Sequence, residues 1–252
     1  MSTTFKFGNV PGAVSTLKDT VVLNGSQTWC DALGADPTVY WICNSGVTVF
    51  QPFMQFNVDY IRQNYTDASV ISAMLHLFVT VDPIYTPVLG NTISIKRVTV
   101  PWGVDSLSAG RTVKNEYLTV GTGPYPVPGA ATMLASLHYS DTNKVLWPGN
   151  SPALSVDDST AWATKANTDP TSFTNGEDLI FDVGSLVQGW VAGTFPNYGL
   201  SFEMPIGQTH ARGNQISVYS NEQTDSTGYY PYLEVTFDGT LQTPTVTPFS
   251  IY

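Results

Sequence analysis

The feature that most constrains this chain is the alternation of apolar and polar residues between positions 178 and 237. Four segments of strand length occur there, and in the clearest one Tyr198, Leu200 and Phe202 alternate with polar residues or glycine. A period of two is typical of a strand with one buried face. The pattern therefore predicts strands of an antiparallel β-sandwich.

A short helical piece interrupts these strands. Leu186, Val187, Trp190 and Val191 recur at spacings of one, three and four, which gives a narrow apolar stripe on a helix. We expect one short helix at a corner of the sandwich, covering part of a sheet. Nothing in this region predicts a reaction.

The composition agrees with an all-β protein. Only 12% of the 252 residues are charged, against a typical value of about 25%, whereas 21 glycines and 17 prolines supply turns. The formal net charge is −10, which disfavours nucleic acid and anionic membranes as partners. No window reaches the run of about 20 apolar residues that spans a membrane, so we expect no membrane segment.

The first residues, MSTTFKFGNVPGAVS, lack the basic start and apolar run of a secretory signal. Either a signal has been removed or the protein is made in a cytosol. The two cysteines, Cys30 and Cys43, lack a partnering histidine cluster for zinc. They form either two buried thiols or one disulfide across a hairpin.

The predicted organisation is one domain with two arms. Residues 1–16 read as an N-terminal extended arm, 17–238 as the sandwich, and 239–252 as a C-terminal extended arm. Within the sandwich, residues 103–177 read as a long loop-rich insertion with a short helix near 129–138.

The best single strand lies at residues 70–81. Ile71, Ala73 and Leu75 begin its apolar face, while Met74 and Phe78 make the opposite face only half polar. We expect a loop, another layer or a neighbouring subunit to cover that second face.

Both arms carry apolar residues that we expect to contact a neighbour. Phe5 and Phe7 lie in the first arm, and Phe249, Ile251 and Tyr252 end the second. These residues predict assembly contacts with copies of the chain or with other proteins, and therefore a homo-oligomer.

Four segments, FMQFNV, ISAMLHL, FDVGSLVQGWVAGTFPNYGLSF and YPYLEVTF, together resemble a DNRLRE-type domain, the family that includes carbohydrate-binding module family 96. The resemblance covers about residues 17–238. It implies a jelly-roll β-sandwich that acts as an accessory or surface module, often binds polysaccharide, and has no catalytic residues. The chain departs from the family pattern at Gln55, Asn57 and Gly184, and the first two changes put a ligand role for that strand in doubt.

Catalysis is not expected. Acyl transfer needs a nucleophile beside a base, and the three histidines, His76, His138 and His210, are poor candidates for that base. We expect each of them to be a polar side chain whose hydrogen bonds are satisfied. Asp157 and Asp158 fit solvated turn residues or one end of a calcium site, because calcium prefers oxygen ligands. Calcium is the one cofactor that the sequence leaves open.

Sugar binding uses aromatic faces next to amides and carboxylates. Tyr125, Tyr139, Trp147 and Trp162 in the insertion are the candidates for such contacts. The alternative is that these rings pack the insertion onto the sandwich.

These observations favour a non-enzymatic structural protein on a virion surface, such as a phage head fibre, spike or decoration subunit, with weak glycan affinity. Other virion proteins, copies of the chain, and a host or environmental polysaccharide are the expected partners. The alternative is a secreted carbohydrate-binding module of a polysaccharide-degrading system.

Overall fold

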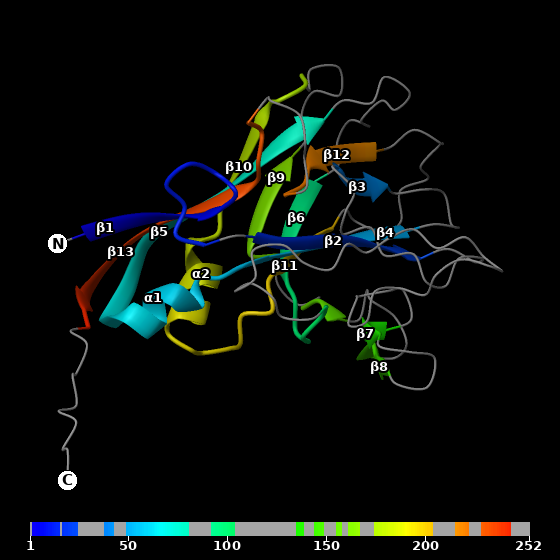
Figure 1. Ribbon diagram of the computed structural model, residues 1–252. Coiled ribbons are helices and arrows are strands. Elements are labelled where there is room, and N and C mark those ends of the chain that lie inside the picture. The colour runs from blue at the N-terminus through cyan, green and yellow to red at the C-terminus, as the bar shows by residue number, and fades with distance from the viewer. Residues whose placement is uncertain are drawn as a thin grey trace, which may run out of the picture.

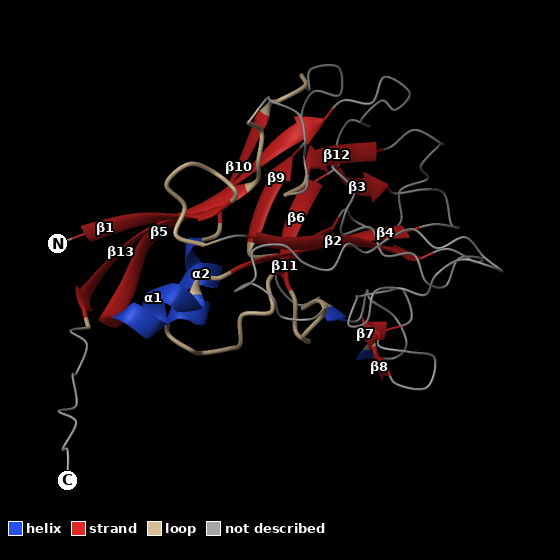
Figure 2. Ribbon diagram, viewed as in Figure 1, coloured by secondary structure: helices blue, strands red, loops and turns tan. Residues whose placement is uncertain are grey.

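The computed structural model shows an antiparallel β-protein in which two sheets face each other and two short helices lie at one end (Figures 1 and 2). The following residues are described: 2–15, 17–24, 38–42, 49–80, 92–103, 135–138, 144–148, 155–157, 161–166, 174–203, 215–221 and 228–242. Cys30 and Cys43 lie outside them. Among these residues, no helix is long and apolar enough to cross a membrane.

The larger sheet, sheet A, is built around the long strand β5. Its strands lie in the order β1 (Ser2–Gly8), β13 (Tyr232–Leu241), β5 (Tyr65–Thr80), β12 (Gln215–Tyr219) and β3 (Thr38–Ile42), and β10 (Asp178–Asp182) also pairs with β5. Each of these pairings is antiparallel.

Sheet B covers the other side of the core. Its order is β2 (Leu17–Asn24), β4 (Val49–Phe56), β11 (Leu200–Glu203), β6 (Thr92–Arg97) and β9 (Ala163–Ala166). A separate small hairpin consists of β7 (Ala135–His138) and β8 (Lys144–Leu146).

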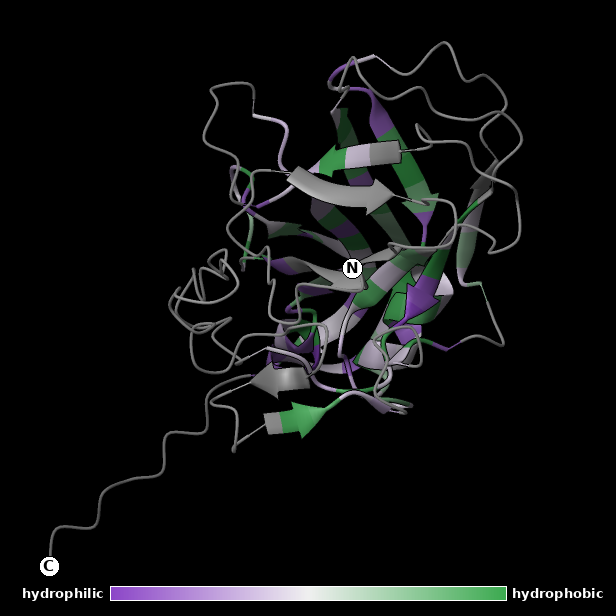
Figure 3. Cartoon of the chain, turned by 90° about the vertical axis from the view of Figure 1, so that its right-hand side faces the viewer, coloured by the Kyte–Doolittle hydropathy of each residue, from purple (hydrophilic) through white to green (hydrophobic). Residues whose placement is uncertain are grey.

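The alternation read from the sequence is confirmed in the core. Leu233, Val235 and Phe237 of β13 are fully buried, and they pack in one cluster with Leu200 and Phe202 of sheet B. Figure 3 shows hydrophobic and hydrophilic residues alternating along the long strands. The two layers therefore share one apolar core.

Ile71 is the exception on β5. Ala73, Leu75 and the later odd-numbered residues are buried, but Ile71 is 58% exposed. The register with β13 moves from Thr236 opposite Ser72 to Phe237 opposite Val70, so Ile71 is the extra residue of a β-bulge. The bulge turns its side chain away from the core, which corrects the sequence prediction.

The predicted corner helix is confirmed as α2 (Gly184–Val191), and all four stripe residues are buried. The Asp182 carboxylate accepts a hydrogen bond from the Gly184 amide at 2.9 Å, so it satisfies one free donor of the first turn. Gln188 connects α2 to the bulge, because its Oε1 accepts a hydrogen bond from the Val70 amide at 2.6 Å.

A second helix, α1 (Asp59–Asn64), follows β4 and was not predicted from the sequence. Ile61 alone is buried in it, while Asp59 and Arg62 form an exposed ion pair at 3.2 Å. The helix joins β4 to β5 and crosses beside α2 (Figure 1).

The N-terminal segment is a strand of the sheet, not a separate arm. All seven residues of β1 pair with β13, and Phe7 is fully buried in the chain's own core. Phe5 is half-buried, with its ring centroid 5.7 Å from Tyr60 and 5.5 Å from Phe237. These contacts leave Phe7 no free surface for a neighbour, contrary to the prediction of assembly contacts here.

The domain boundaries shift at the C-terminus as well. β13 continues to Leu241, so residues 239–241 belong to sheet A and not to an extended arm. Phe249, Ile251 and Tyr252 lie outside the described residues, and their predicted contacts stay a prediction.

The insertion contributes to the sandwich. β9 pairs with β6 in sheet B, and Ala135–His138 is a strand, which corrects the expected helix over those residues. A second, smaller cluster attaches the insertion to the outer side of sheet B; its buried members are Phe53, Val98, Trp102, Trp147 and Val156.

Candidate functional site

A groove of about 650 Å³ lies where the two helices meet the end of sheet B. Four stretches line it: the end of β4 with α1, the segment 101–103 after β6, Trp190 of α2 with the segment 193–198 that follows, and Lys18 of β2. The volume falls within the range of about 300–1,000 Å³ typical of ligand sites.

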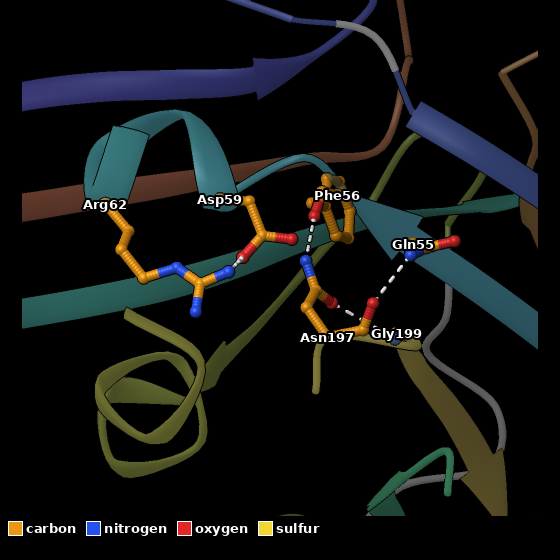
Figure 4. Close-up of polar contacts among 6 residues, drawn as sticks. All are labelled: Gln55, Phe56, Asp59, Arg62, Asn197 and Gly199. Carbon is orange, nitrogen blue, oxygen red and sulfur yellow. Dashed lines mark hydrogen bonds and ion pairs between the residues drawn. The ribbon is translucent and has the colours of Figure 1, made fainter. Parts of the chain in front are cut away.

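Asn197 holds one wall of the groove together (Figure 4). Its amide nitrogen donates to the Phe56 carbonyl at 2.7 Å, and its Oδ1 accepts from the Gly199 amide at 3.1 Å. The Gln55 amide donates in turn to the Asn197 carbonyl at 2.7 Å. Because Asn197 is buried, these bonds satisfy backbone groups that water cannot reach.

Gly199 is required where this wall meets β4. Its φ is +89°, and a Cβ there would lie 2.1 Å from the Met54 carbonyl oxygen. Glycine alone combines that backbone conformation with so close an approach. The NYGL segment therefore shapes the groove.

Another part of the groove wall is built on Trp102. Its indole N–H donates to the Tyr198 carbonyl at 2.8 Å. Lys18 donates to the Trp102 carbonyl at 2.7 Å and lies 4.2 Å from the centroid of its ring. This geometry combines a charge-assisted hydrogen bond with a cation–π contact.

Three polar groups of the groove take no hydrogen bond in the described part of the chain: the side-chain amides of Asn57 and Gln63 and the hydroxyl of Tyr198. Lys18 and Arg62 provide two positive charges and Asp59 one negative charge. The groove is thus locally positive in a chain of net charge −10. It can donate, accept and stack, which suits a polar ligand rich in hydroxyl or carboxylate groups.

The structure separates the aromatic sugar candidates. Trp147 is only 2% exposed and stacks on Phe53 at 5.3 Å and 11°, so no face is free for a sugar. Trp162 is half-buried and meets Phe195 edge-on at 5.5 Å. For Trp147 the packing alternative fits; Tyr125 and Tyr139 lie outside the described residues.

The predicted calcium ligand Asp157 is engaged by Arg97. Its Oδ2 lies 3.2 Å from the guanidinium, and its backbone amide donates to the Arg97 carbonyl at 2.9 Å. Asp158 lies outside the described residues, and within them no three His, Cys, Asp or Glu side chains cluster as metal ligands would. The calcium site stays a prediction.

The outer face of sheet A carries a row of rings. His76 donates a hydrogen bond through Nδ1 to Asp178 Oδ2 at 2.8 Å and stacks on Tyr232 at 4.2 Å. Burial, followed by the charges of Asp178 and Glu234, raises the pKa of the Tyr232 hydroxyl above its ordinary value of 10.0. His76 is therefore the satisfied polar histidine that the sequence predicted.

Apolar side chains continue this outer face. Ile180 is 48% exposed beside His76, and Met74 and Phe78 are half-buried on the same side of β5. Phe78 stacks on Tyr229 at 5.6 Å. Neighbouring rings thus cover part of the face, while Ile71 and Ile180 remain open to solvent.

No family model matches the chain, and no curated protein matches it. The resemblance to DNRLRE-type domains consequently stays a proposal based on the segments quoted above.

The groove could be anticipated only in fragments. The sequence singled out Gln55 and Asn57, but as departures that put a ligand role in doubt. Lys18, Arg62 and Trp102 were not predicted, because they lie on separate segments that carry no common motif. Their proximity follows from the pairing of β2 with β4 and from the helix after β4.

Proposed function

We propose that this chain is a non-enzymatic jelly-roll subunit on the outside of a virus particle, such as a head fibre, spike or decoration protein, that holds a glycan segment in the groove. The observation that carries the proposal is the groove itself. Asn57, Gln63 and Tyr198 offer uncommitted amides and a hydroxyl on walls held rigid by Asn197 and Trp102.

Rigid walls favour recognition, because a preformed site loses little conformational freedom when a ligand binds. Polysaccharides present hydroxyl groups, which amides match as both donors and acceptors. Lys18 and Arg62 are positively charged, so we expect the groove to bind acidic as well as neutral polysaccharides. The chemistry of these side chains supports binding, and none is needed as a nucleophile or base.

The virion setting is supported by surfaces beyond the groove. Ile71 and Ile180 are 58% and 48% exposed, so both apolar side chains are available for a contact with another protein. The acidic, weakly charged composition also agrees with a surface subunit that binds neither nucleic acid nor membrane.

The glycan part is tested with the double variant Asn57→Ala, Gln63→Ala on a panel of neutral and acidic polysaccharides. The matched control is Asn9→Ala, Gln242→Ala, which removes two exposed amides elsewhere. We expect retention to fall at least about tenfold in the groove variant, since loss of two hydrogen bonds weakens binding by about 1.4 kcal/mol or more. Equal retention of both double variants would disprove the groove as the binding site.

The virion part is tested separately, by imaging particles and labelling this chain on them. We expect the label in regular positions outside the capsid. Its absence from purified particles, with the protein found free in the medium, would refute the assignment.

One observation favours the second candidate, a secreted carbohydrate-binding module. Phe7 packs inside its own sandwich, so its side chain is not available for a contact with another subunit. Under that alternative the groove variant loses glycan retention as above, but the wild-type chain is found outside particles. The two experiments together therefore distinguish the candidates.

A further inference from the structure

Strand β1 is the outermost strand of sheet A, and the described residues cover only part of its free edge. On one side it pairs with β13 over its whole length. On the other side the Gly8 amide donates to the Ser15 carbonyl at 2.8 Å, and the Val14 amide donates to the Lys6 carbonyl at 2.9 Å. The backbone groups of even-numbered residues therefore point away from β13.

The backbone N–H and C=O groups of Ser2 and Thr4 also point away from β13. Residues 14 and 15, which bond to Lys6 and Gly8, do not extend along this part of the strand. In the described part of the chain, the outward backbone groups of Ser2 and Thr4 take no hydrogen bond. Natural edges are commonly protected by lysine, proline or a bulge. Here the open half reads Ser-Thr-Thr-Phe, and Lys6 stands at the covered end, 3.5 Å from Glu234.

The two sides of this edge differ in character. The inner side carries Phe5, whose ring lies 5.7 Å from Tyr60 and 5.9 Å from Tyr65. The outer side carries the Thr4 hydroxyl, hydrogen-bonded to the Thr236 hydroxyl at 2.9 Å. A strand added here must alternate, with apolar residues inward beside Phe5 and polar residues outward beside Thr4.

The end of the chain has this pattern. Phe249-Ser250-Ile251-Tyr252 follows Pro248 and offers four consecutive backbone amides with alternating side chains. Phe249 and Ile251 match the aromatic inner side of the edge. Ser250 and Tyr252 match the outer side, because both carry hydroxyl groups.

The connection is long enough for residues 249–252 to reach a neighbouring copy. Residues 243–248 contain Pro244 and Pro248, and proline-rich linkers extend by about 3.1 Å per residue, or about 19 Å over six residues. By contrast, β13 ends three residues past the position opposite Ser2, which is only about 10 Å. Six residues are therefore long enough to reach a neighbouring copy of the chain.

We propose that residues Phe249–Tyr252 of one copy add as a strand to the open half of β1 in a second copy. This joint links subunits through backbone hydrogen bonds, as in other cases of strand addition. It is independent of the groove, so glycan retention and subunit association can fail separately.

The test uses the full chain in solution and measures its mass by analytical ultracentrifugation. Thr4→Pro removes an outward N–H and the hydroxyl contact with Thr236 but no backbone bond to β13, and proline is tolerated at such an edge position. Thr4→Ala is the matched control, because it removes the same hydroxyl and keeps the N–H. A third variant ends at Gln242.

We expect an oligomer for the wild type and for Thr4→Ala, and monomers for Thr4→Pro and for the truncated chain. A monomeric wild type would overturn the proposal. An oligomer that persists in the truncated chain would show that another segment, such as a second β1, occupies the edge, and would overturn it too.

Hydrogen exchange gives an independent reading that does not depend on a substitution. The amide of Thr4 should exchange slowly in the wild-type oligomer and at least about tenfold faster in the truncated chain. Slow hydrogen exchange at Thr4 in a monomeric wild type would instead show that the C-terminal segment docks on its own chain. That result would contradict the proposed strand addition between two copies.

Discussion

Lys18 and Trp102 are 84 positions apart in the sequence, yet the lysine ammonium donates to the tryptophan carbonyl at 2.7 Å and lies 4.2 Å from its ring centroid. The contact joins β2 to the segment after β6. Because Trp102 also donates to Tyr198, one lysine supports two walls of the groove.

Replacing Lys18 with methionine keeps the aliphatic stem and removes the charge. We expect the free energy of unfolding to fall by about 1 kcal/mol, since a hydrogen bond from a charged donor and a cation–π contact are lost at a partly exposed site. Lys18→Arg, the control, should lose less. Urea denaturation checks this, and an unchanged midpoint for Lys18→Met would show that the contact contributes nothing.

Trp147 should matter for stability. It fills the second cluster against Phe53, so Trp147→Ala should lower the free energy of unfolding by about 3–5 kcal/mol. Trp147→Phe keeps a stacked ring and should cost clearly less. Thermal and urea unfolding measure both variants; a fully stable Trp147→Ala variant that no longer binds glycan would restore Trp147 as a sugar contact.

Gly199 should not tolerate a side chain. Alanine there combines a positive φ with a Cβ against the Met54 carbonyl, and we expect a loss of more than about 2 kcal/mol. Gly228 is the matched control, because its φ is +75° but a Cβ added there would meet no atom within 4 Å. Gly228→Ala should therefore lose only about 1 kcal/mol. Equal losses in urea denaturation would mean that the approach to Met54 is not tight.

The strands and α2 could be predicted from the sequence because their residues alternate or recur without interruption. The burial of Leu233, Val235 and Phe237 could be predicted from the two-residue period of a strand alone. α1 was missed because Ile61 is its single buried residue, which is too little to produce a helical period. Local pattern therefore predicted the elements with one clear buried face.

Ile71 and the groove could not be predicted in the same way. The exposure of Ile71 depends on a register shift opposite Thr236 and Phe237 and on the contact of Gln188 with Val70. The groove depends on Lys18, Trp102 and Tyr198, which pairing between distant strands brings together. Both are properties of the assembled sandwich.

Tyr232 should make stability fall at alkaline pH. Its folded-state pKa is raised, chiefly by burial and then by Asp178 and Glu234. Its contribution is thus fully present below the unfolded value of 10.0 and is lost as pH rises through the folded value. Tyr232→Phe keeps the ring stacked on His76 and removes the ionisable group.

The free energy of unfolding, measured by urea at several values between about pH 8 and 11, checks this. The wild type should decline more steeply than Tyr232→Phe above about pH 10. Parallel curves for the two proteins would show that Tyr232 has the same pKa in both states.

Glycan binding in the groove is best measured by a map of backbone amide chemical shifts during titration with an oligosaccharide that binds in the glycan panel. We expect the perturbed amides to cluster at Asn57, Gln63 and residues 193–198, and to shift little in the Asn57→Ala, Gln63→Ala variant. Shifts confined to the outer face of sheet A or to Trp162, with residues 193–198 unmoved, would contradict glycan binding in the groove.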